Sequence, residues 1–349
     1  HWFSDSTLYI ALALAGFTIV FGARHLDSAE RYEGMVAAIA FESLVKLLAF
    51  LAVGAFVVWG LFDGLADLFA RAQAVPELAR LLTLDQGRGF AYPQWFAMTM
   101  LSALSVIVLP RQFQMMVVEN VDERHLKRAA WVFPLYLLLI NLFVLPIALA
   151  GLLHFGGGAN PEGFVLTLPQ AAGQHALALL AFVGGLSAAT GMVIVEAIAV
   201  ATMVCNDLVM PALLRTRRFQ AAQAAHGGDL SGYLLGIRRS AIVAILLLGY
   251  VYYRLAGDAY ALVGIGLISF AAVAQFAPAM LGGMYWKGGT RAGALAGMGA
   301  GFTLWIYTLL LPSFAKSGWL GPDFLEHGVF GIDLLKPEVQ GSSSGWVCF

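Results

Sequence analysis

Long apolar stretches separated by short polar segments are the main pattern along this chain. Eight of them have about the 20 residues that an α-helix needs to cross a bilayer. They cover residues 7–23, 34–62, 92–110, 130–154, 173–213, 238–256, 259–286 and 292–313. The second and the fifth are longer than a bilayer requires, so we expect them to tilt or to extend beyond it. The pattern predicts an all-α, polytopic membrane protein with about eight transmembrane helices.

Three segments between these stretches have a character of their own. Residues 63–84 are amphipathic and predict an external helix that lies on the surface and is limited by Pro76. Its apolar side chains share one helical face: Leu65, Leu68, Phe69 and Ala72. Residues 155–172 are rich in Gly and Pro and predict an external loop. Residues 219–232 predict a flexible cytoplasmic segment.

Lysine and arginine are divided unevenly between the two sets of loops. Thirteen lie in loops that share one side of the membrane, in the ranges 24–31, 111–128, 215–239 and 287–291, and six lie in the opposite set. Because cytoplasmic loops carry the excess of basic residues, the first set is predicted to be cytoplasmic. The first residues of the chain and the tail after Pro312 are then predicted to be external.

The composition agrees with a membrane protein and argues against several other classes. Hydrophobic residues make up 60% of the chain and charged residues 12%, whereas a soluble domain has about a quarter charged residues. The net charge of −1 offers no basic field for nucleic acid. Cys205 and Cys348 do not form a disulfide framework. The sequence has no phosphate-binding loop and no nucleophile elbow, so we do not expect it to be an enzyme or to bind a cofactor or a metal. We expect the lipid bilayer to be a partner.

Ionisable residues inside two of the apolar stretches are candidates for ion coupling. Glu42 and Lys46 are four residues apart, in the order that favours an ion pair on a helix surface. They form either a self-neutralised pair near the cytoplasmic end of the helix or a site for a proton or a substrate. Glu196 has no Lys or Arg three or four residues away, so it is either protonated between helices or faces a watery cavity. A charge at the bilayer centre costs roughly 2.5–3.5 kcal/mol. The presence of each of these residues in an apolar stretch therefore calls for a structural or functional explanation.

Polar and aromatic side chains in the third and seventh stretches are candidates for a solute path. The third stretch has hydroxyl groups three residues apart, which either hydrogen-bond across helices or line a path. Pro278 interrupts the seventh stretch, and a broken helix is tolerated where it lines a cavity or is backed by neighbouring helices. The predicted solute-binding residues are Trp95, Phe96, Thr99, Ser102, Ser269 and Gln275.

Several stretches resemble the sodium/solute symporter family. SAATGMVIVEAIAVATMVCNDLVMPALLR resembles the helix that ends in the Asp-Leu-Tyr-like motif of the family, here Asp207-Leu208-Val209. MLGGMYWKGGTRAGALAGMGAG resembles its Trp-Lys…Gly-Ala…Gly segment, the most specific of the matches. RHLDSAERYEGMVAAIAFESLVKLLAFLAVG and PRQFQMMVVENVDERHLKRAAWVFPLYLLLINLFVLPIALAGLL are closer to one branch. That branch is the transporter-like membrane domain of bacterial hybrid sensor histidine kinases, the type tied to histidine uptake and to carbon and nitrogen control.

The resemblance implies a leucine-transporter-type bundle of inverted repeats, with the solute near the midplane between discontinuous helices. Residues 1–315 correspond to a partial transmembrane domain, and residues 316–349 to an external or disordered tail. The match begins at the fifth helix of the family, so we expect a chain truncated at both ends, without the first helices. The full-length parent is expected to be a multi-pass protein of the bacterial inner membrane that carries the kinase domains.

The same resemblance bears on the coupling ion. In sodium-coupled members a hydroxyl pair ligates sodium about 15 and 16 residues before the Asp of the motif, which here are Met192 and Gly191. Neither offers a side-chain oxygen, and Thr190 is one residue away, so the sodium site is expected to be degraded. The predicted ion-coupling residues are Thr190, Glu196 and Glu42, with H⁺ favoured over Na⁺.

The expected function is proton-coupled transport or sensing of a small organic solute, an amino acid such as histidine, as the input domain of a sensor kinase. The alternatives are a stand-alone sodium-coupled symporter and a receptor domain that does not transport.

Overall fold

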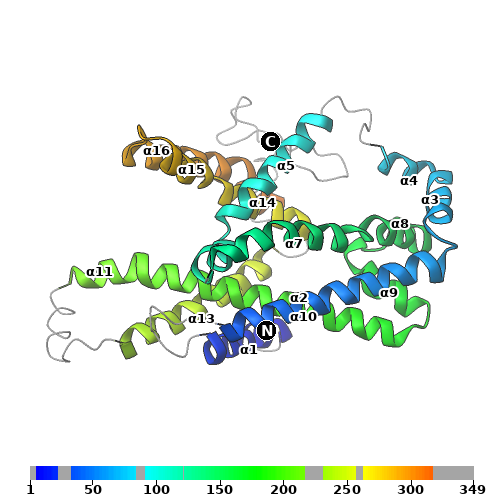
Figure 1. Ribbon diagram of the computed structural model, residues 1–349, viewed down its shortest axis with the longest axis horizontal. Coiled ribbons are helices and arrows are strands. Elements are labelled where there is room, and N and C mark those ends of the chain that lie inside the picture. The colour runs from blue at the N-terminus through cyan, green and yellow to red at the C-terminus, as the bar shows by residue number, and fades with distance from the viewer. Residues whose placement is uncertain are drawn as a thin grey trace. The chain divides into compact units, whose positions relative to one another are not determined.

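The computed structural model describes residues 5–22, 33–83, 91–120, 122–216, 231–256 and 262–316, and all regular elements among them are helices (Figure 1). The predicted segment 219–232 and the predicted tail lie largely outside the described residues. Six described helices are long and apolar enough to cross a membrane: Val36–Leu61, Glu123–Phe155, His175–Leu214, Gly232–Arg254, Gly264–Tyr285 and Arg291–Ala315. A seventh is added if Trp95–Val108 and Pro110–Val118 form one span with a break at Leu109. The first predicted stretch corresponds to the shorter apolar helix Ser6–Val20. The prediction of an all-α, polytopic membrane protein is therefore confirmed.

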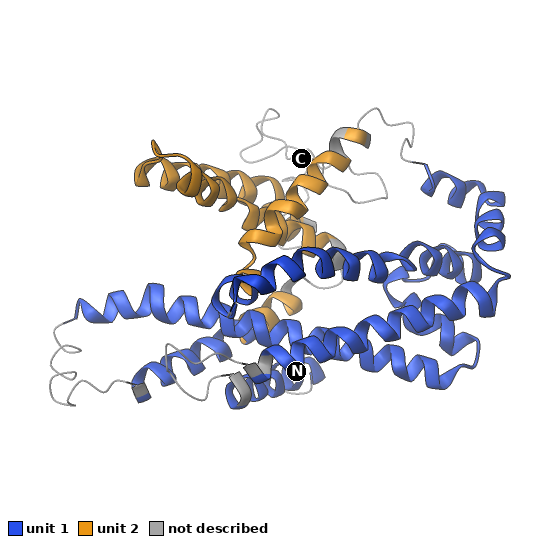
Figure 2. Cartoon of the chain, in the orientation of Figure 1, with its two compact units in different colours: residues 1–86, 114–246 blue, residues 87–113, 247–349 orange. Residues whose placement is uncertain are grey.

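The chain divides into two compact units (Figure 2). Unit 1 contains residues 1–86 and 114–246, and unit 2 contains residues 87–113 and 247–349. The helices of unit 1 are α1 (Ser6–Gly22), α2 (Glu33–Phe56), η2 (Val57–Leu61), α3 (Leu65–Ala74), α4 (Pro76–Leu81), η3 (Gln114–Val118), α7 (Glu123–Asn141), α8 (Val144–Phe155), η4 (Pro161–Gly163), α9 (Phe164–Ala171), α10 (His175–Met203), η5 (Val204–Val209), α11 (Met210–Leu214) and most of α13 (Ser231–Ala256). Those of unit 2 are α5 (Ala91–Val108), α6 (Pro110–Phe113), the end of α13, α14 (Leu262–Ala274), α15 (Ala277–Tyr285), α16 (Arg291–Trp305), η7 (Ile306–Leu310) and α17 (Leu311–Lys316).

The amphipathic segment 63–84 forms two helices, α3 and α4, which meet at Val75 just before Pro76. Leu68 and Ala72 are fully buried, in a cluster that includes Val53 of α2 and Leu149 of α8. The prediction of a helix lying on the surface was therefore incomplete. Its apolar face packs against other helices of unit 1. Full burial of Leu68 and Ala72 removes more apolar surface from water than a position on the protein surface would, and this favours packing inside the unit.

The predicted loop at 155–172 contains a helix, which is a correction. After Gly156, whose φ of 76° favours glycine, Asn160 caps a short 3₁₀ turn and α9 follows. Phe164 and Leu168 are one helical turn apart and both are buried. Gly151 of α8 leaves the space that the Phe164 ring occupies, since an added Cβ there would overlap the ring. The sequence predicted a loop here because the segment is rich in Gly and Pro, and its apolar helical face is only two turns long.

Unit 2 is held together by α5, α14 and α16. The Ser105 hydroxyl of α5 donates to the Phe270 carbonyl of α14 at 3.2 Å, and the Trp305 indole of α16 donates to the Ile268 carbonyl at 2.9 Å. A break at Gln275–Phe276 separates α14 from α15, close to Pro278, as the sequence pattern predicted.

Candidate functional site

The most extensive helix contact described in unit 1 joins α2 and α10, which run side by side (Figure 1). Gly184 of α10 lies so near α2 that an added Cβ would be 2.7 Å from the Cβ of Ala49 and 3.7 Å from the Cα of Lys46. Small residues allow two membrane helices to approach this closely. Gly184 therefore sets the distance between the two helices.

Seven residues further along the same face, α10 meets a carboxylate. An added Cβ at Gly191 would overlap the Glu42 carboxyl group. Gly184 lies against Ala49, and Gly191, later on α10, lies against Glu42, which is earlier on α2. The two helices are therefore antiparallel. The structure thus brings together two residues that the sequence analysis had placed in separate sites, Glu42 and the degraded sodium position Gly191.

Two polar groups surround Glu42. Lys46, one turn further along α2, is half-buried and attracts the carboxylate electrostatically. Tyr136 of α7 donates its hydroxyl to the carbonyl of Ser43 at 3.3 Å and is close enough for the Glu42 charge to act on it. Helices α2, α7 and α10 therefore converge at Glu42. Sequence reasoning missed Tyr136, because nothing in its own helix indicates that its hydroxyl reaches the backbone of α2 beside Glu42.

The other predicted ion-coupling residues lie on α10 but outside this contact. Glu196 is half-buried, and five residues beyond Gly191 place it about 140° around the helix. The Thr190 hydroxyl donates to the carbonyls of Leu186 and Ser187, each at 3.0 Å, within its own helix. Met192 is 44% exposed. Their part in ion coupling stays a prediction.

The predicted solute-binding residues all belong to unit 2, where the structure does not gather them into one described cavity. Trp95 and Phe96 are exposed, and Ser102 is exposed on the same helix. The hydroxyls of Thr99 and Ser269 donate to carbonyls one turn back in their own helices. Gln275 lines a cavity between α15 and α16. Of the hydroxyl series on α5, Ser105 is the one seen to bond another helix. A role in solute binding remains a prediction for all six.

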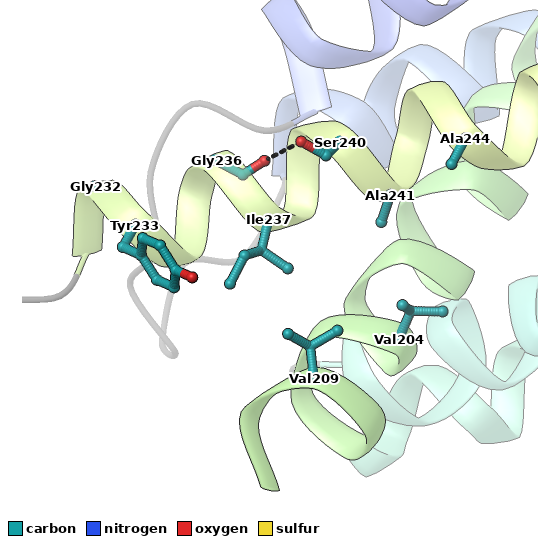
Figure 3. A pocket seen from close by; sticks show the side chains of 9 residues that line it. All are labelled: Val204, Val209, Gly232, Tyr233, Gly236, Ile237, Ser240, Ala241 and Ala244. Carbon is teal, nitrogen blue, oxygen red and sulfur yellow. Dashed lines mark hydrogen bonds between the residues drawn. The ribbon is translucent and has the colours of Figure 1, made fainter. Parts of the chain in front are cut away.

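A hollow in unit 1 of about 580 Å³ lies between η5 and the first half of α13 (Figure 3). Its lining carries no charged side chain: Val204, Val209, Gly232, Tyr233, Gly236, Ile237, Ser240, Ala241 and Ala244. The Ser240 hydroxyl donates a hydrogen bond to the Gly236 carbonyl at 2.9 Å. This lining offers little to a charged solute.

Beside this hollow, Arg238 is buried within α13 and donates to the Thr202 hydroxyl of α10. Arg238 was predicted to lie in a loop, and this prediction is wrong because α13 begins at Ser231. A buried basic residue on α13 therefore ties it to α10. Among the described residues, no group of three His, Cys, Asp or Glu side chains could hold a metal ion.

The chain is similar to a protein of Cupriavidus necator that is named an uncharacterized symporter. The two are 29% identical over 186 residues, which cover 50% of this chain and 25% of the relative. The chain thus matches about a quarter of that relative's length. No family model matches the chain, and no solved structure matches it. The apolar helices indicate a multi-pass membrane protein, and about half of the chain is similar to a protein that is named a symporter.

Proposed function

We propose that this chain belongs to a transporter that moves a small organic solute across the bacterial inner membrane together with protons, and that Glu42 carries the proton. The observation behind this proposal is the Glu42 carboxyl group packed against Gly191, inside the apolar helix Val36–Leu61. An ionisable residue at membrane depth is costly, so it is by default a candidate for function.

The surroundings of Glu42 suit a group that gains and loses a proton. When ionised, the carboxylate is attracted by Lys46; when protonated, it is neutral and can donate a hydrogen bond. The two states therefore differ in the forces between α2 and α10, at a point where Gly191 leaves no side chain between them. A change of protonation acts directly on the helix contact.

The proposed identity of the solute and the proposed role in a sensor kinase rest on the resemblance of the sequence to the sodium/solute symporter family. An amino acid such as histidine is the first choice of solute, and the chain acts as the input domain of a hybrid sensor kinase. This part of the proposal predicts that histidine changes autophosphorylation of the complete protein. Histidine binding without flux would instead favour a receptor that does not transport.

The test is accumulation of labelled L-histidine by proteoliposomes that contain the complete protein, with an inward proton gradient and no sodium. For one proton per uncharged solute, a gradient of one pH unit supports about ten-fold accumulation, because each unit corresponds to about 1.36 kcal/mol. We expect Glu42→Gln to abolish this accumulation while histidine exchange at equal pH persists.

Glu196→Gln is the matched control, since it removes the carboxylate of α10, which lies about 140° around that helix from Gly191. Accumulation by Glu42→Gln equal to that of the unmodified protein would refute the role of Glu42. A requirement for sodium that survives a proton uncoupler would refute proton coupling.

A further inference from the structure

A second cavity, of about 500 Å³, lies within unit 2 between α15 and α16. Trp286, Thr290 and Arg291 lie at the turn between the helices, and Gln275 lies at the far end, where its amide oxygen approaches Gly301. Six of the fourteen lining residues are glycine. At Gly282 and Gly297 an added Cβ would meet no atom within 4 Å, so the space beside them is open. The cavity is thus a slot with a basic and aromatic entrance.

Charge distinguishes this part of the protein. Within the described ranges of unit 2, residues 91–113, 247–256 and 262–316, there are five Lys and Arg and no Asp or Glu. Arg291 is the charged residue among those that line the cavity. In this part of the unit its guanidinium has no carboxylate of the protein as a counter-charge. A ligand for the entrance is therefore expected to be an anion.

The membrane supplies a suitable anion on the side where the cavity opens. The distribution of Lys and Arg predicts that the turn at 287–291 is cytoplasmic. Anionic phospholipids give the cytoplasmic leaflet its negative surface potential, and basic pockets between membrane helices bind their headgroups. Trp286 is 69% exposed at the end of α15, as a tryptophan at the level of lipid headgroups would be.

We infer that the cavity between α15 and α16 binds an anionic phospholipid, with its phosphate at Arg291 and an acyl chain along the glycine wall. The guanidinium can donate two parallel hydrogen bonds to a phosphate. The Thr290 hydroxyl lies beside it and already accepts from the Gly293 amide at 3.1 Å, which holds the entrance in place. The open space beside Gly297 accommodates the chain.

The experiment measures lipid binding to the purified complete protein by native mass spectrometry, with phosphatidylglycerol and phosphatidylcholine of identical chains. We expect phosphatidylglycerol to bind more tightly, and Arg291→Gln to weaken it about five-fold, the effect of one basic side chain at an anionic lipid surface. Arg111→Gln is the matched control, because it removes an equal charge from unit 2 outside the cavity and leaves binding unchanged. Gly297→Leu keeps the charge but fills the slot, so it weakens both lipids.

Three results would overturn the inference. If Arg291→Gln and Arg111→Gln weaken phosphatidylglycerol binding equally, the preference for this lipid comes from general surface charge and not from the cavity. Unchanged lipid binding by a folded Gly297→Leu variant would show that no chain enters the slot. Displacement of the lipid by millimolar L-histidine or inorganic phosphate would assign the entrance to a soluble anion or solute instead.

Discussion

Replacement of Gly184 by leucine tests the close contact between α2 and α10. The Cβ would lie 2.7 Å from the Cβ of Ala49, whereas carbon atoms in contact are about 3.5–4.0 Å apart. The helices must therefore separate by about 1 Å, and such overpacking costs about 2 kcal/mol. Gly185→Leu is the matched control, because an added Cβ at Gly185 meets nothing within 4 Å. The gain in helix propensity is the same for both variants and cancels in the comparison.

The two variants should differ by about 4–8 °C in unfolding temperature. Cys205 is 2% exposed, so a thiol-reactive dye labels it as the protein unfolds, and a Cys348→Ser background removes the other thiol. If Gly184→Leu unfolds at the same temperature as Gly185→Leu, or higher, the helices are not in close contact at Gly184. The register that places Glu42 against Gly191 would then be wrong as well.

Two further predictions concern the core around Phe164 and a helix cap. Phe164→Ala should destabilise the protein by about 3–5 kcal/mol, because the ring is 2% exposed, and Phe155→Ala should cost less at 37% exposed; equal effects in thermal unfolding would contradict the core described here. The hydrogen bond from the Arg124 guanidinium to Asp122, the cap of α7, holds the pKa of Asp122 below its ordinary value. The cap therefore contributes stability above the ordinary carboxyl pKa and loses it as pH falls through the lowered pKa. Arg124→Gln should raise that pKa in a carboxyl NMR titration, and an unchanged titration would refute the assigned cause.

The membrane-spanning helices were predictable because their signal is local. Residues 34–62 and 292–313 read as continuous apolar stretches, and the structure has helices from Glu33 to Leu61 and from Arg291 to Lys316. A span needs only length and hydrophobicity, and both can be read from neighbouring residues. The break near Pro278 was predictable for the same reason.

The candidate ion site could be predicted only in part. Glu42 and Gly191 were each singled out, but their contact depends on how α2 and α10 are aligned, which involves residues far apart in the sequence. One signal was present: Gly184 and Gly191 are seven residues apart, as are Glu42 and Ala49, so each pair shares a helix face. This spacing indicates a helix contact but does not name the partner helix. Tyr136 gave no such signal.

The position of α2 has a mechanical consequence. The helix carries Glu42 in its first half and continues through Val53 to Val57 of η2, and both valines are fully buried in the core formed with α3, α8 and α9. Eleven residues of helix separate Glu42 from Val53, about 16 Å along the axis. Because a close-packed core does not deform gradually, a tilt of α2 at Glu42 must move α3, α8 and α9 as one piece or unpack Phe164 and its neighbours. Helix α2 with η2 thus links the titratable Glu42 rigidly to the core around Phe164.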